Sequence, residues 1–167
     1  LRTRAEPLGI AIRTANSAEE WQAAMDQGDF FGVLIQYPAS SGWLADWSEA
    51  CDAILVDFHA EATSEKMAMG HYLDGLVTVV AGTHTHVQTA DEQILPKGTA
   101  YITDIGMTGP LHSVIGIKKE LAIEKFLTGM PRRFEVASGP TVFCALLVDL
   151  DATLGKAVSV ERIRVMD

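Results

Sequence analysis

Residues 77–87, VTVVAGTHTHV, join an apolar run to two histidines. An apolar, β-prone run predicts a buried strand, and His84 and His86 follow where that strand ends. Residues 54–61, ILVDFHAE, repeat the arrangement and place His59 after a second apolar run. Ligands of open α/β sheets bind outside the carboxyl ends of the strands, and neutral imidazole is the commonest metal-binding side chain. The two segments therefore predict a metal site made by the three histidines.

The rest of the chain alternates between strand-like and helix-like patterns. Strands are expected at residues 8–12, 31–37, 54–58, 77–81 and 100–103, helices at 17–28, 43–51, 64–73 and 118–128, and a final hairpin at 141–150 and 157–165. In the last helix, Leu121, Phe126 and Leu127 are expected to face inward. The alternation predicts an α/β fold with a mostly parallel sheet, flanking helices and a C-terminal antiparallel hairpin. The length suits a single domain over residues 1–167.

Composition narrows the classes of partner. The chain has 22 acidic and 13 basic residues, a formal net charge of −9. Such a surface repels nucleic-acid backbones and anionic membranes, so no duplex and no membrane is expected as a partner. No apolar run approaches the ~18 residues of a membrane span. Without a secretory signal or paired cysteine spacing, the sequence favours a cytoplasmic protein.

Four motifs carry a family resemblance. They are VDFHAEATSEK at 56–66, GTHTHVQTAD at 82–91, YITDIGMTGP at 101–110 and PRRFEVA at 131–137. From about residue 52 onward the chain resembles the C-terminal part of the YmdB-type, calcineurin-like metallophosphoesterases, which are phosphodiesterases. The resemblance implies a two-metal centre with His59, His84 and His86 among its ligands. It also implies a two-sheet sandwich, of which this chain would form half. The Asp, Glu and Asn ligands and the general-acid histidine of that family's N-terminal half have no matching motif here.

The N-terminal segment resembles a different family. Residues 2–10, RTRAEPLGI, and 31–38, FGVLIQYP, are similar to the glycine-cleavage P-protein, glycine decarboxylase. That enzyme holds pyridoxal phosphate on a lysine, and residues 1–51 contain no lysine, so no pyridoxal phosphate is expected. The chain thus resembles a chimera with a seam near residue 52. Half a sandwich would leave an apolar sheet face uncovered, which predicts a homo-oligomer.

The expected ion is zinc, iron or manganese, since three ring nitrogens suit these metals. The acidic residues nearest the histidines are less clearly placed. Asp57 is expected to point away from His59. Glu61 is expected either to orient an imidazole or to favour the start of the following helix. Asp104 and Thr108 belong to a glycine-containing loop that either lines the pocket or is a plain turn.

Basic residues near the end of the last helix suggest a phosphate contact. Arg132 and Arg133 follow Pro131 and would either meet a phosphate of a small-molecule substrate or form a solvated pair. His71 and His112 are expected to be surface or packing residues.

Two functions follow. The first is a metal-binding remnant of a phosphodiesterase or phosphoesterase whose two-metal site is incomplete, because bridging carboxylates are missing. The alternative is a folded chimera without catalysis.

Overall fold

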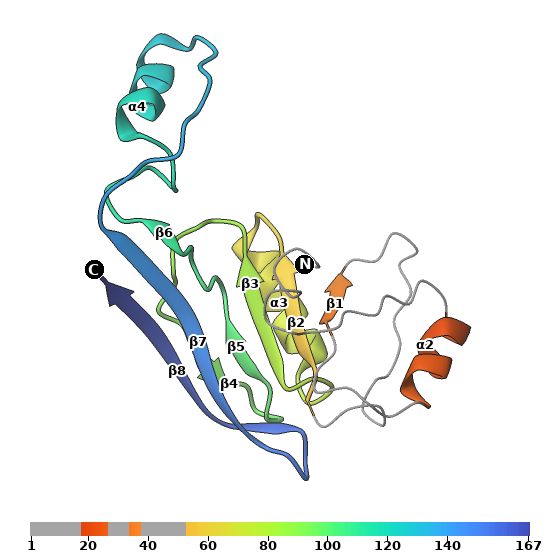
Figure 1. Cartoon of the computed structure of the whole chain (residues 1–167). Coiled ribbons are helices and arrows are strands. Elements are labelled where there is room, and N and C mark those ends of the chain that lie inside the picture. Colours follow the sequence, from red (N-terminus) through yellow and green to blue (C-terminus); the bar gives the residue numbers. More distant parts are fainter. Residues whose placement is uncertain (1–17, 27–33, 38–52) are drawn as a thin grey trace. The chain divides into compact units, whose positions relative to one another are not determined.

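The computed structural model describes residues 18–26, 34–37 and 53–167 (Figure 1). The chain divides into two compact units, Leu1–Phe31 and Gly32–Asp167. The described part of the first unit is helix α2 (Ala18–Met25), with two acidic residues in its first turn. The strand predicted at 8–12 and the helix predicted at 43–51 lie outside the described residues. In the part of the chain that is described, no helix has the length and apolar character needed to cross a membrane.

A five-stranded sheet organises the second unit. Its strands, in spatial order, are β1 (Leu34–Tyr37), β2 (Leu55–His59), β3 (Val79–Thr83), β5 (Ala100–Ile102) and β4 (Gln93–Ile94). The first four run parallel, and β4 is an antiparallel edge. Parallel pairing brings the carboxyl ends of neighbouring strands to one edge of the sheet, so the segments that follow β2 and β3 meet there.

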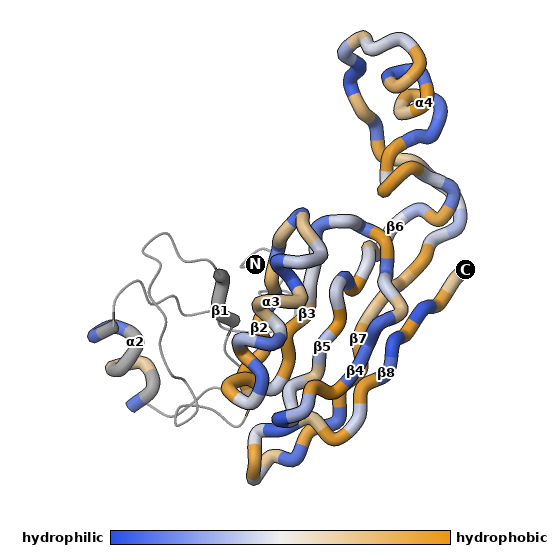
Figure 2. The backbone as a smooth tube through the Cα atoms, turned by 180° about the vertical axis from the view of Figure 1, so that it is seen from behind, coloured by the Kyte–Doolittle hydropathy of each residue, from blue (hydrophilic) through white to orange (hydrophobic). Residues whose placement is uncertain are grey.

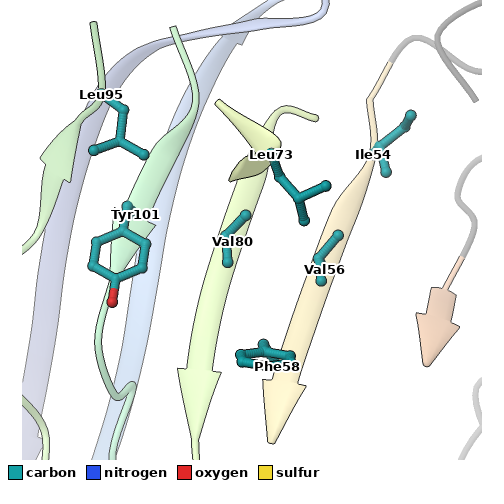
Figure 3. Packing of buried hydrophobic residues seen from close by; sticks show 7 residues of the cluster. All are labelled: Ile54, Val56, Phe58, Leu73, Val80, Leu95 and Tyr101. Carbon is teal, nitrogen blue, oxygen red and sulfur yellow. The ribbon is translucent and has the colours of Figure 1, made fainter. Parts of the chain in front are cut away.

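One face of this sheet packs under helix α3 (Thr63–Leu73). Its buried cluster joins Val56 of β2, Val80 of β3 and Tyr101 of β5 with Leu73 of the helix, as Figure 3 shows. Side chains of successive strand residues point to opposite faces, so every second residue of β2 enters this cluster. Burying several large apolar side chains, each worth about 1.5–3 kcal/mol, fixes the register of the strands.

The other face packs against a second, antiparallel sheet. That sheet consists of β6 (Gly109–Pro110), β7 (Thr141–Asp151) and β8 (Lys156–Met166), in the order β6-β7-β8. Val79 and Ile102 of the first sheet share a buried cluster with Ala157 of the second, and the half-buried Leu146 packs against this cluster. The predicted α/β class is therefore confirmed, with its mostly parallel sheet, its C-terminal hairpin and the two-sheet packing of a half sandwich.

Residues 111–138 form what we call the arm, which leaves β6, carries helix α4 (Lys119–Thr128) and returns to β7. The arm extends away from both sheets (Figure 1), and Figure 2 shows hydrophobic residues along it. Phe126 and Leu127 are 82% and 81% exposed. The expectation that these two side chains face inward is wrong, because in the described part of the chain no sheet face covers them. Leu121 is half-buried.

Candidate metal centre

The ends of β2 and β3 bring two histidines into contact. His59 is the last residue of β2 and pairs in register with Thr83, so His84 follows at the adjacent strand end. Nδ1 of His84 lies 3.1 Å from Nε2 of His59. The two rings meet edge to face, with their centroids 4.9 Å apart, and both side chains are exposed. The predicted convergence of neighbouring strand ends is present for this pair.

The spacing of these two nitrogens fits a shared cation. Nitrogen ligands bind zinc at about 2.0–2.1 Å, so two adjacent ligands of one ion have nitrogens about 3–3.4 Å apart. The 3.1 Å separation of the His59 and His84 nitrogens falls in that range. A hydrogen bond between the rings has the same length, and an ion would replace its proton.

A relay of hydrogen bonds fixes the proton of His59. The hydroxyl of Thr83 donates to Oδ1 of Asp57 at 2.8 Å. The same hydroxyl oxygen lies 3.1 Å from Nδ1 of His59. A hydroxyl has a single proton, so in this arrangement Nδ1 of His59 is the donor and Nε2 keeps its lone pair. Ligating histidines are held in this way, by a partner on the other ring nitrogen.

The expectation that Asp57 points away from His59 is wrong. The two residues are two positions apart in β2, and side chains two apart share one face of a strand. Both are exposed, while Phe58 between them is buried. The period of two along a strand therefore puts the Asp57 carboxylate on the same face as His59.

His86 is oriented by the base of the arm. Its Nδ1 lies 3.0 Å from the carbonyl oxygen of Ile115. A carbonyl only accepts, so Nδ1 of His86 donates and its Nε2 carries a lone pair. Across residues 18–26, 34–37 and 53–167, however, no three His, Cys, Asp or Glu side chains are grouped closely enough to hold an ion. Within that part of the chain, His59 and His84 form a ligand pair rather than a complete cage.

The backbone of this loop is strained. His84 has φ of 118° and His86 has φ of 65°, in the left-handed region that non-glycine residues rarely adopt. Each such residue costs on the order of 1–3 kcal/mol, and strain of this kind clusters at functional sites. We call residues 84–91 the histidine loop.

A buried carboxylate lies under the histidine loop. Oδ2 of Asp104 accepts from Nζ of Lys66 and from the amide of Thr85, both at 2.9 Å, and Oδ1 accepts from the amide of Gly106. Lys66 and Asp104 are each 1% exposed. Burial raises the pKa of Asp104, but the hydrogen bonds from Lys66, Thr85 and Gly106 outweigh it, so the pKa lies below its ordinary 3.8. Asp104 is therefore a buried anchor beneath the site and does not line its surface.

The far end of the histidine loop is held separately. The amide of Thr89 donates to the carbonyl of Asp104, whose own amide donates back to the Thr89 hydroxyl. Asp91 accepts from both the amide and the hydroxyl of Thr103. Burial raises the pKa of Asp91, but the hydrogen bonds from Thr103 and Thr89 lower it by more, so the pKa lies below its ordinary 3.8. Two acidic side chains thus fix the loop to the end of β5.

The remaining predicted residues are not joined to the histidines. Glu61 and Thr108 are exposed, and within the described residues neither makes a hydrogen bond or ion pair. Arg132 pairs with Glu124 inside the arm. Among residues 53–167, no hydrogen bond or ion pair links Arg132 or Arg133 to the histidine pair. His71 and His112 are exposed, as expected.

Lys66 is the residue that sequence reasoning missed. It lies on the buried stripe of α3 with Gly70 and Leu73, at spacings of four and three residues. A lysine on the apolar stripe of a helix signals a buried ion pair, because a buried charge needs a partner. In the sequence of α3, however, the apolar residues are not gathered on one face, so nothing local marked this lysine as buried.

Two packed sheets with a pair of histidines at neighbouring strand ends define an α/β protein with a candidate metal site. Comparison with known proteins specifies the family. Residues 14–163 match the model of the YmdB-like protein family, and the chain belongs to that family. A 2',3'-cyclic-nucleotide 2'-phosphodiesterase of Bacillus subtilis (strain 168) is 52% identical over 124 residues, which are 74% of this chain and 47% of the relative.

Two solved structures share the fold. A hypothetical protein from Thermus thermophilus is 48% identical with a TM-score of 0.66, and the match covers 70% of this chain and 45% of that one. A novel phosphatase from Mycoplasma pneumoniae is 36% identical with a TM-score of 0.67, and the match covers 94% of this chain and 49% of that one. The chain thus spans about half the length of the relatives it matches.

These matches test the prediction that the chain is a chimera joined near residue 52. The family match begins at residue 14 and so extends across residue 52. The comparisons give no support to a glycine-cleavage P-protein segment or to a chimera.

Proposed function

We propose that this chain supplies part of the divalent-metal centre of a phosphodiesterase or phosphoesterase, with His59 and His84 as adjacent ligands and His86 as a third. The observation that carries the proposal is the 3.1 Å approach of Nδ1 of His84 to Nε2 of His59. The strained backbone of His84 and His86 supports it, because strain persists where function requires the geometry. The B. subtilis relative is named as a phosphodiesterase, which supports the same chemistry.

The residues of the site have separate roles in this proposal. Asp57 and Thr83 keep the proton of His59 on Nδ1, and the Ile115 carbonyl does the same for His86. Each of these histidines therefore keeps a lone pair on Nε2, and the lone pair of His59 faces Nδ1 of His84. A bound divalent cation supplies charge that polarises a phosphoryl oxygen and lowers the pKa of water. Zinc, iron and manganese all suit nitrogen donors.

The proposed site is incomplete as a two-metal centre. Pairs of ions ~3.5–4 Å apart are the usual arrangement of phosphoesterases. Carboxylates normally bridge such ions, and the described residues bring the histidines together with no bridging carboxylate. We therefore expect one ion per chain. The proposed substrate is a small molecule that carries a phosphodiester, and a 2',3'-cyclic nucleotide is the first to test. A cytoplasmic location stays a prediction.

Metal binding tests this proposal. Calorimetric titration of the chelator-treated protein with Mn²⁺, Zn²⁺ and Co²⁺ should show one site, and His84→Ala should weaken it at least about tenfold. His71→Ala is the matched control, because it removes an exposed imidazole from α3. The same samples are then assayed with bis(p-nitrophenyl) phosphate and with 2',3'-cyclic AMP. Equal metal binding by wild type and His84→Ala would contradict the proposal. Metal binding without turnover would support the ligand assignment and favour the alternative of a folded, non-catalytic chain.

A further inference from the structure

The Lys66–Asp104 pair is the most deeply buried charged contact of the described residues, and the proposed metal chemistry does not use it directly. Each side chain is 1% exposed, and the ammonium lies 2.9 Å from the carboxylate. A buried pair of this kind is weak support for stability, because the loss of hydration offsets much of the attraction. The other contacts of the two side chains therefore indicate their role.

The carboxylate of Asp104 reaches the peptide between the two strained histidines. Its Oδ2 accepts from the amide of Thr85 at 2.9 Å. Thr85 lies between His84 and His86, whose φ angles are both positive. A hydrogen bond to a charged acceptor is roughly twice as strong as a neutral one. This contact is therefore well placed to offset the strain of the loop.

Lys66 connects the same carboxylate to the segment after His59. It lies on the first turn of α3, which begins four residues beyond His59. Its aliphatic stem runs beside Gly82, where an added Cβ would lie 2.9 Å from Cδ of Lys66. One buried contact thus joins the chain after β2, the end of β3 and the end of β5.

We infer that Lys66 and Asp104 are positioning residues that hold the histidine loop, through the Thr85 amide, in the backbone conformation that presents His84 to His59. The inference rests on the proposed metal-binding function. Neither residue touches the ion or a substrate in this proposal. Partners that orient metal ligands typically change metal affinity about 10- to 100-fold when they are removed.

Two double variants isolate the contact without leaving a buried charge alone. Lys66→Met/Asp104→Asn keeps an oxygen that can accept from Thr85, and Lys66→Met/Asp104→Leu removes it at similar volume. Thr78→Val is the matched control for stability. It removes a buried hydroxyl that bonds Ile54 and Gly155 just before β3 begins, at the opposite end of the strand from the histidines.

Two readouts are measured on each folded variant: the Kd for Co²⁺ together with its visible spectrum, and hydrogen exchange of the Thr85 amide without metal. The Leu variant should bind Co²⁺ at least about tenfold more weakly, with an altered spectrum and faster Thr85 exchange. The Asn variant should stay near wild type, and Thr78→Val should change neither readout. Equal Kd and equal exchange for the Asn and Leu variants would overturn the inference. If the wild type binds no Co²⁺, the proposed function fails, and Thr85 exchange still decides whether the contact holds the loop.

Discussion

By the sheet edge we mean the carboxyl ends of β2, β3 and β5. The sheet edge and the arm belong to the same unit, yet charged side chains are buried at the sheet edge and exposed in the arm. At the sheet edge, Lys66 and Asp104 are sealed from water beneath the histidine loop. In the arm, Lys118 and Glu135 form an ion pair that is 46% and 59% exposed, while Phe126 and Leu127 are left in solvent. Both regions contain charged and apolar side chains. What differs is whether another layer covers them, and this decides which contacts carry stability and which are free to meet a partner.

The largest expected effect comes from one glycine of the sheet edge. A Cβ at Gly82 would lie 1.8 Å from the carbonyl oxygen of Thr103, so a strand would have to move. Gly82→Ala should cost more than about 4 kcal/mol or prevent folding. Gly129 ends α4 with φ of 66° and has nothing within 4 Å of an added Cβ, so Gly129→Ala should cost only about 1–2 kcal/mol of backbone strain. Urea unfolding measures the free energy of unfolding of both variants. Similar losses in the two variants would show that the sheet edge is no more tightly packed than the arm.

The two ion pairs provide the second test. Lys66→Met leaves the buried Asp104 carboxylate without its countercharge and should reduce the free energy of unfolding by about 3–5 kcal/mol. Lys118→Met in the arm should leave the unfolding midpoint within experimental error, because solvent and salt screen an exposed pair. Thermal denaturation at low and high salt compares them. A salt-sensitive loss at Lys118 as large as that at Lys66 would show that exposure does not separate the pairs.

Acid should destabilise the protein by protonating two carboxylates at the sheet edge, Asp91 and Asp104. The pKa values of Asp91 and Asp104 are below 3.8 in the folded chain, so their contribution to stability is complete above about pH 4. It is lost as the pH falls through the lowered values. Urea midpoints between pH 2 and 6 should therefore decline below pH 4, and Asp91→Asn should flatten this decline. Lys118 also lowers the pKa of Glu135, but Glu135→Gln should leave the profile unchanged, because that pair is exposed.

The smallest effect on stability is expected in the arm. The arm, residues 111–138, contains five basic and three acidic side chains, a net +2, which leaves −11 for the rest of the chain. A basic, apolar arm complements an acidic second copy, so we expect self-association. Phe126→Ser/Leu127→Ser should shift sedimentation toward the monomer and change the free energy of unfolding by less than about 0.5 kcal/mol. Ile94→Ser, at an exposed position of the edge strand β4, is the control. A wild-type monomer at high concentration would contradict the expectation.

The sequence determined the elements whose signals are local. The apolar runs before His59 and His84 and the long terminal hairpin were all placed correctly, because hydrophobic periodicity and turn residues act over a few positions. The short strands β4 and β6, of two residues each, carry too little pattern to be predicted. The convergence of His59 and His84 followed from the rule that parallel strands end at one edge.

The surroundings of those histidines, and the choice of which apolar faces are covered, depend on contacts between distant parts of the chain. The contact of Lys66 with Asp104 spans 38 residues, and the one between His59 and Thr83 spans 24. The apolar residues Phe126 and Leu127 of α4 were expected to face a core, yet among the described residues no sheet covers them. Periodicity states which residues share a face, but burial depends on what the folded chain places opposite that face, and this is a property of the whole fold.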